Sequence, residues 1–332
     1  MARNAIYFPY INVPPDPWLL RMVLYWDRLN SIVPMDHMFR PELLTPQMRD
    51  LVASGLVHQL FPAQYLHDVR DFERPFAHFA ELWIARRRGS LGDRFTRIHA
   101  EKLDRLMRPL QDLGLVKDDE YPWVLMPTPL ANAFMSYLAA SLGQLAEVDA
   151  APITNSAQSC ASLVATERTL YRDALLEDLL PIPSMSEELT IDSVLAFKDK
   201  YSEHATRFRE RLEEECILVG KSASIDERKL RLAALKSKLQ RESDEVADAM
   251  KMSWKTVSMG AIVPIISVAL PILEADWKLQ PATAAGMAGT LGVAVYQASQ
   301  VLGQARNAER RPMAYAPLVR NRLFNRVRKR AT

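Results

Sequence analysis

The sequence predicts a mainly α-helical protein that opens with a small β-α-β element and ends with a hydrophobic helical hairpin. Three observations support this fold class. Apolar residues recur at helical spacing over most of the chain, short aromatic and β-branched runs lie near its start, and two long charge-free stretches lie near its end. With 332 residues, 48% of them hydrophobic and 25% charged, the chain has a globular composition and enough length for more than one domain.

The β-α-β element is predicted from the first 34 residues. Residues 5–11 are aromatic and β-branched, as in a short strand, and Pro9 favours an edge position for that strand. Asp16 followed by Pro17 marks the start of a helix, because aspartate caps helices and proline is tolerated in the first turn. Residues 31–34 are again β-branched and complete the element.

Helical patterns alternate with turns after this element, so residues 1–150 are expected to form one α-rich module. Two helices in it are predicted to end at a glycine, Gly55 and Gly114, after which the chain continues extended. Residues 151–190 are expected to be a linker with a connecting helix.

Residues 191–250 are predicted to form a charged antiparallel helical hairpin with its turn near residues 219–224. Ser224 and Glu227 have the spacing of a capping box at the start of the second helix. The two apolar stripes of this hairpin are Phe197, Tyr201, Ala205, Phe208, Leu212 and Leu232, Leu235, Leu239, Val246, Met250. Such a hairpin is the expected surface for a protein partner or a second copy of the chain.

Residues 251–305 form the most hydrophobic part of the sequence. Residues 256–273 carry no charge and, at ~1.5 Å per residue, reach roughly 27 Å as a helix, close to the ~30 Å of a membrane core. Residues 279–305 are also free of charge. The expected membrane-interface anchors are Trp254, Lys255 and Trp277, and the expected helix-packing glycines are Gly286, Gly289 and Gly292.

Two interpretations of this segment stay open. Basic residues lie outside both stretches and acidic residues lie between them, which favours a membrane hairpin with both termini in the cytoplasm. Pro264 and Pro271 interrupt the first stretch and glutamines dilute the second, as in a helical hairpin buried in a soluble protein.

Residues 306–332 form a basic tail. It contains eight arginines, one lysine and one acid, or 9 − 1 = +8, so that the rest of the chain carries 2 − 8 = −6. Its apolar residues suggest an amphipathic basic helix near an anionic membrane surface, with nucleic acid as the less favoured ligand. The expected anion, lipid or nucleic-acid contacts are Arg86, Arg87 and Arg88 in an earlier loop and Arg320, Arg322, Arg326, Arg328, Lys329 and Arg330 in the tail.

The sequence contains no recognisable catalytic or cofactor motif. Cys160 and Cys216 lack neighbours at metal-ligand spacing, and the six histidines do not form an H-E-x-x-H pattern. No phosphate-binding loop or nucleophile elbow is present either. We therefore expect no catalytic residue, cofactor or metal. The first residues lack the apolar core of a signal peptide, so we expect a cytoplasmic protein, not a secreted one, in association with the inner membrane if the hairpin inserts.

The opening of the chain resembles an uncharacterised bacterial family, the domain of unknown function numbered six-two-three-six. The resemblance rests on Ala5–Ile11, Trp18-Leu19, Tyr25–Asp27 and Ile32–Pro34, and it continues less specifically through Leu180–Pro183 and Phe208-Arg209. It covers roughly residues 5–250. It implies a bacterial origin and supplies no activity and no catalytic residues. The basic tail does not match the pattern.

Three functions are weighed on these grounds. The preferred one is a non-enzymatic sensor or effector that docks on or in the inner membrane through its hydrophobic hairpin, as a stress or phage-defence effector would. The first alternative is a soluble scaffold with residues 256–305 buried as core. The second is a nucleic-acid-associated protein or enzyme that uses the basic residues.

Overall fold

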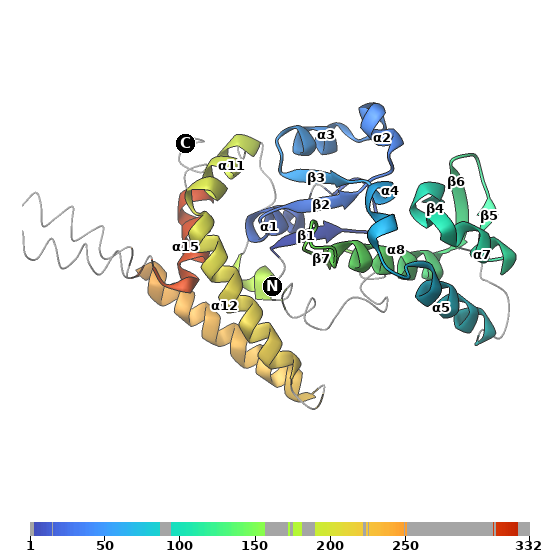
Figure 1. Cartoon of the computed structure of the whole chain (residues 1–332). Helices are drawn as coiled ribbons and strands as arrows, with labels where there is room; N and C mark the ends of the chain where they lie inside the picture. Colours follow the sequence, from blue (N-terminus) through green and yellow to red (C-terminus); the bar gives the residue numbers. More distant parts are fainter. Residues whose placement is uncertain are drawn as a thin grey trace, which may run out of the picture. The chain divides into compact units, whose positions relative to one another are not determined.

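The computed structural model is mostly helical, with a small parallel sheet at the N-terminus. It describes residues 3–14, 16–86, 94–156, 172, 175–180, 190–221, 224, 226–248, 250, 308 and 310–324. The chain divides into two compact units. The first comprises residues 1–177 and 182–198, and the second comprises residues 178–181 and 199–332 (Figure 1).

A four-stranded parallel sheet organises the first unit (Figure 1). Its order is β3-β2-β1-β7, and the strands are β1 (Asn4–Tyr7), β2 (Leu29–Ile32), β3 (Val57–Leu60) and β7 (Ala150–Ile153). Helix α1 (Pro17–Tyr25) connects β1 to β2, as the predicted β-α-β element requires. Helix α3 (Pro46–Ala53) precedes β3, and α8 (Thr128–Gly143) precedes β7.

The local signals read from the sequence are confirmed in this unit. The Asp16 carboxylate caps α1, because its Oδ1 accepts a hydrogen bond of 3.0 Å from the Leu19 backbone N–H. Gly55 and Gly114 follow helices and have φ angles of +74° and +67°, the left-handed conformation expected of a glycine at a helix end.

The predicted edge position of the first strand is wrong. Strand β1 lies between β2 and β7 and pairs with both. The strand ends at Tyr7, two residues before Pro9. The proline therefore lies outside the ladder, where its missing N–H interrupts no hydrogen bond between strands.

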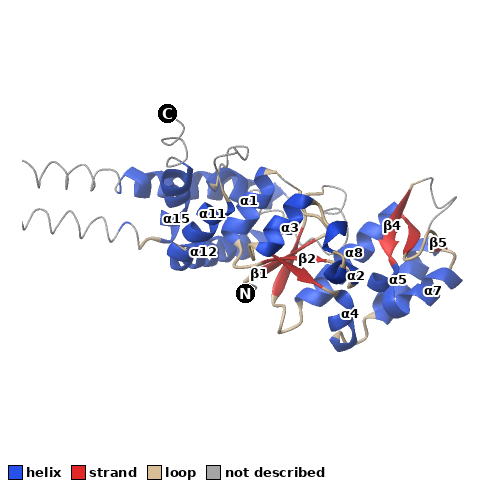
Figure 2. Cartoon of the chain, turned by 90° about the horizontal axis from the view of Figure 1, so that it is seen from above, coloured by secondary structure: helices blue, strands red, loops and turns tan. Residues whose placement is uncertain are grey.

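The chain between β3 and β7 contains a second, antiparallel sheet that the sequence did not reveal. Its order is β4-β6-β5, with β4 (Phe95–His99), β6 (Trp123–Pro127) and β5 (Lys117–Asp118) (Figure 1). Strands β4 and β5 are also labelled in Figure 2. The helices of this region are α4 (Pro62–Tyr65), α5 (Glu73–Ala85), α6 (Ala100–Leu103) and α7 (Met107–Asp112). Short helices also occur before β3: α2 (Asp36–Phe39) and a 3-10 turn at Pro41–Leu43. Further 3-10 turns lie at Leu66–Asp68 and Asp104–Leu106.

Aromatic side chains hold α5 against α8 in the core of the first unit. The Phe76 ring lies 5.2 Å from that of Phe134, and the Phe72 ring stacks on Tyr137 at 5.2 Å. The Tyr137 hydroxyl donates a hydrogen bond of 2.7 Å to the Phe72 backbone carbonyl, so the polar tip of this partly buried side chain is paired.

Helix α11 (Ile191–Lys200) joins the first unit through its residues up to Lys198. The Lys198 ammonium donates hydrogen bonds to the carbonyl oxygens of Val23, Trp26 and Asp27, at 2.7, 2.9 and 3.2 Å. These carbonyls belong to the C-terminal end of α1, where helix geometry leaves carbonyls without intrahelical partners and a cation is favourable.

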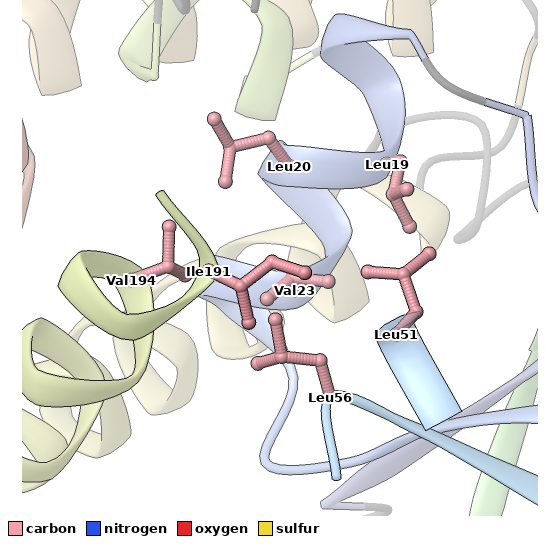
Figure 3. Close-up of a pocket in the computed structure, with 7 residues that line it drawn as sticks. All are labelled: Leu19, Leu20, Val23, Leu51, Leu56, Ile191 and Val194. Atoms are coloured by element: carbon pink, nitrogen blue, oxygen red, sulfur yellow. The ribbon is translucent and has the colours of Figure 1, made fainter. Parts of the chain in front are cut away.

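A small apolar pocket lies where α11 meets α1 and α3. Figure 3 shows its lining, which consists of Leu19, Leu20, Val23, Leu51, Leu56, Ile191 and Val194. Its volume of about 30 Å³ is too small for a ligand larger than a few atoms, and no polar atom faces it. We regard it as a packing defect and not as a ligand site.

The second unit is helical. It contains α12 (Ser202–Gly220), a helix over residues 226–248, a 3-10 turn at Pro312–Ala314, α15 (Tyr315–Leu318) and a π-helical turn at Val319–Phe324. Ion pairs join Arg211 to Glu242 at 3.9 Å and Glu215 to Lys238 at 3.4 Å. Because the two pairs run in opposite order along the two helices, the helices are antiparallel.

Residues 256–305 of the predicted hydrophobic hairpin lie outside the described part of the chain. Among the helices that the structure does describe, none combines the length and the apolar character needed to cross a membrane.

Candidate functional site

The two chain ends that border the hydrophobic segment are held in the same helical unit. Met250, the last described residue before the segment, is buried, and so is Ala308, the first described residue after it. The guanidinium of Arg207 on α12 donates a hydrogen bond of 3.0 Å to the Arg310 carbonyl. The chain therefore leaves from the helix 226–248 and returns onto its helical partner.

Three contacts of the returning chain fix this arrangement. The Tyr315 ring lies 5.6 Å from the Phe208 ring of α12, and the Arg320 guanidinium lies 3.8 Å from the Asp244 carboxylate. Asp244 is only six residues before Met250, or about 9 Å along the helix. The described residues on both sides of residues 251–307 thus lie on one pair of helices.

The apolar side of the basic tail is occupied. Tyr315, Leu318, Val319 and Leu323 are buried in the helical unit, while Arg320 and Arg322 are partly exposed. The sequence predicts that this apolar side faces a membrane surface, but the structure buries these large side chains inside the protein, away from both water and lipid.

The other predicted contacts are distributed over the two units. Arg86 is exposed at the end of α5 in the first unit, and Arg320 and Arg322 belong to the second. The following predicted residues lie outside the described ranges: Arg87, Arg88, Trp254, Lys255, Trp277, Gly286, Gly289, Gly292, Arg326, Arg328, Lys329 and Arg330.

A polar cluster lies beyond the carboxyl end of β2 in the first unit. It consists of Asp36, His37, His99, Glu101 and Lys102, and we call it the Asp36 cluster. Asp36 begins α2, four residues after β2 ends, and the other chain segment runs from the end of β4 into α6. The His37 Nδ1 lies 2.7 Å from Asp36 Oδ1, and the His99 Nε2 lies 3.6 Å from Asp36 Oδ2.

Burial shapes the protonation of this cluster. Burial lowers the pKa of the Lys102 ammonium to about 8, although the neighbouring Glu101 opposes this change. Burial also lowers the pKa of the His99 imidazole, against the opposing charges of Asp36 and Glu101. Burial opposes ionisation of Asp36, but the hydrogen bond and charge of His37 outweigh it and lower the pKa of its carboxyl. At neutral pH the cluster therefore contains an ionised Asp36, a neutral His99 and a mostly protonated Lys102.

A second polar network, between β1 and β7, is satisfied by its own members. The buried Tyr7 hydroxyl donates to Asn155 Oδ1 at 3.1 Å, and the Asn155 amide donates to Asp16 Oδ2 at 3.4 Å. Burial raises the pKa of the Tyr7 hydroxyl well above its ordinary value. This network explains how the β1 and β7 ends are held together.

The Asp36 cluster was missed in the sequence because its two halves lie far apart in the chain. The histidines carried no motif, and Glu101 and Lys102 resemble an ordinary helix surface. The one available signal was an acid shortly after the second predicted strand.

Within the described ranges, no group of three or more His, Cys, Asp or Glu side chains is arranged to hold a metal ion. Comparison of the chain with protein-family models, curated proteins and solved structures found no match.

Proposed function

We propose that this protein is a non-enzymatic effector that docks on or in the inner membrane through residues 256–305. The observation that carries the proposal is the return of the chain onto its own helical pair. A membrane hairpin requires both of its ends on one side of the bilayer, and the Arg320–Asp244 and Tyr315–Phe208 contacts supply that condition.

The sequence of the segment supports the same conclusion. Residues 256–273 are long enough for a thin or locally thinned hydrocarbon core, and Trp254 and Trp277 flank them as interfacial aromatic residues do. Lys255 and Arg306 lie just outside the two apolar stretches, so the positive-inside tendency places both ends on the cytoplasmic side.

In this proposal the first unit recognises a partner or ligand, and the charged helical pair transmits the event to the membrane segment. A bacterial stress or phage-defence effector would have this order of parts, which is an analogy of layout. A scaffold that buries residues 256–305 as its own core is the rival function.

The test replaces residues 251–307 with a sixteen-residue Gly-Ser linker and keeps the rest of the chain. Such a linker spans roughly 20–24 Å, enough to join two ends held on one helical pair. Truncation at residue 250 is a poorer test, because it also removes the buried Tyr315 and Leu318. Membranes are washed with alkaline carbonate. The proposal expects the full chain to stay in the membrane fraction and the linker variant to be soluble and folded.

A matched pair of variants separates insertion from general insolubility. The double substitution Ile266→Asp and Leu270→Asp puts two charges into the first apolar stretch, each costing about 2.5–3.5 kcal/mol of insertion free energy. The control, Leu230→Asp, puts a charge at an exposed helix position. Loss of wash resistance in the double variant alone supports insertion. A full chain that is soluble without detergent, together with an aggregating linker variant, supports the scaffold.

A further inference from the structure

The Asp36 cluster contains buried hydrogen-bonding atoms that the surrounding chain does not satisfy. His99 is 5% exposed, yet within the described ranges neither of its ring nitrogens makes a hydrogen bond. Its closest approach, 3.6 Å to Asp36, is too long for one. Glu101 Oε2 accepts a hydrogen bond of 2.8 Å from the Met35 N–H, but no described residue donates to the buried Oε1.

Lys102 adds a buried cation to this group. It is 4% exposed, and its ammonium is close enough to Glu101 for that charge to oppose the effect of burial on its pKa. Buried polar atoms are normally paired, because leaving one unpaired costs about 1–3 kcal/mol and more for a charge. His99 and Glu101 have such unpaired atoms, and together with the neighbouring Lys102 ammonium they indicate a molecule that completes their hydrogen bonds.

The position of the cluster in the fold also favours a ligand. Open parallel sheets bind their ligands outside the carboxyl ends of the strands, and Asp36 lies beyond the carboxyl end of β2. Asp104, which follows α6, has a φ of 46°, a left-handed conformation that a non-glycine residue adopts at some cost. Such strain gathers at binding sites, where the surrounding structure maintains it.

The unpaired atoms define the chemistry of the missing molecule. Glu101 Oε1 needs a donor, Lys102 needs acceptors, and a neutral His99 needs one of each. A fully ionised anion has only acceptors, so it offers no donor to Glu101 Oε1 and does not complete the cluster. A neutral hydroxyl both donates and accepts, so two adjacent hydroxyls can donate to the carboxylates of Glu101 and Asp36 while accepting from Lys102.

The strand order supports the same chemistry. In dinucleotide-binding sheets the strands β3, β2 and β1 are also adjacent, and an acidic residue after the second strand hydrogen-bonds the ribose hydroxyls. Asp36 occupies the comparable position here. The loop from β1 to α1, residues 8–16, contains three prolines and no glycine, so the pyrophosphate-binding part of that arrangement is missing.

We infer that the Asp36 cluster binds a neutral vicinal diol, either the ribose of a nucleoside or a free sugar. Asp36 and Glu101 accept hydrogen bonds from the hydroxyl groups, and Lys102 donates hydrogen bonds to the hydroxyl oxygens. The His99 ring nitrogens form hydrogen bonds with the other polar atoms of the ligand. This site does not depend on the membrane proposal, because all of its residues belong to the first unit.

The test measures binding to the full chain by isothermal titration calorimetry. The ligands are adenosine, uridine, ribose and glucose, and 2′-deoxyadenosine is the probe that lacks one hydroxyl. We expect at least one diol to bind. If a nucleoside binds, 2′-deoxyadenosine should bind about tenfold or more weakly than adenosine, because a site built for a hydroxyl rejects the analogue without it. Binding of glucose or ribose alone identifies the source as a sugar and also supports the inference.

Variants locate the site. Asp36→Asn and Glu101→Gln preserve shape and should each weaken binding about tenfold. The control is Asp68→Asn, because Asp68 also pairs with a histidine, His67 at 3.3 Å, but both side chains are exposed. Thermal unfolding verifies that each variant is folded. If one of these two variants does not fold, the binding affinity of the other variant tests the site.

Three results would overturn the inference. The first is that none of these compounds binds at concentrations up to about 10 mM. Ordered water would then be the molecule that completes the hydrogen bonds of the cluster. Another is equal affinity for adenosine and its 2′-deoxy analogue. The third is binding that persists unchanged in the folded Asp36→Asn and Glu101→Gln variants.

Discussion

The ring of Tyr315 packs against the ring of Phe208, with 5.6 Å between their centroids, although the two residues lie on opposite sides of the hydrophobic segment in the sequence. Both rings are fully buried. Residues 313–323, which follow the hydrophobic segment in the sequence, are therefore part of the core of the helical unit.

Removing the Tyr315 ring should lower the free energy of unfolding of the helical unit. Tyr315→Ala leaves a cavity beside Phe208, and large-to-small substitutions of buried aromatic residues cost about 3–5 kcal/mol. The control is Leu230→Ala, because Leu230 is 73% exposed and its loss should cost less than about 0.5 kcal/mol. Urea unfolding followed by circular dichroism measures both. Similar midpoints for the two variants would contradict the core role of Tyr315.

Lys198 should contribute more to stability than Lys200 on the same helix. Lys198→Met removes three hydrogen bonds to carbonyls at the end of α1, for an expected loss of about 2–4 kcal/mol. Lys200→Met changes an exposed side chain and should be nearly neutral. Hydrogen exchange of the last turn of α1 supplies a local measurement, which should accelerate in the first variant only.

The stability of the first unit should rise with pH above about 8 because of Lys102. Its pKa is about 8 in the folded state and 10.5 when exposed, so between these values the unfolded state binds more protons. The ammonium therefore destabilises the fold below pH 8, by at most about 3 kcal/mol, and this cost disappears as pH rises to 10.5. Lys102→Met should stabilise the protein at pH 7 and lose that advantage at pH 10.

The control for this pH dependence is Lys117→Met, because Lys117 is exposed in the same unit. Urea midpoints at pH 7, 8.5 and 10 are compared for the two variants. A difference between them that does not change with pH would show that Lys102 keeps its proton in the folded state.

Gly143 should tolerate no side chain. A Cβ at this last residue of α8 would lie 2.1 Å from the Ala150 carbonyl oxygen of β7, so Gly143→Ala must push helix and strand apart. We expect a loss of about 3 kcal/mol or more. A Cβ at Gly114 would have no atom within 4 Å, so Gly114→Ala should lower the free energy of unfolding only through its positive φ, by about 1–2 kcal/mol. Equal thermal midpoints for the two variants would argue against the close approach of α8 to β7.

The sequence by itself determined the features that depend on neighbouring residues. The Asp16 cap, the glycine ends at Gly55 and Gly114 and the β-α-β opening were predicted because each arises from backbone chemistry within a few positions. Helical periodicity likewise predicted a mainly helical chain.

Only the tertiary structure decided how distant segments pair. Strands such as β5 and β7 have two and four residues, too short for a periodic pattern, and they exist because a partner strand satisfies their backbone. The Asp36 cluster likewise arises where the chain after β2 meets the end of β4, and the burial that shifts the pKa of Lys102 is a property of that meeting. Desolvation depends on what surrounds a side chain in space, and a linear sequence does not contain that information.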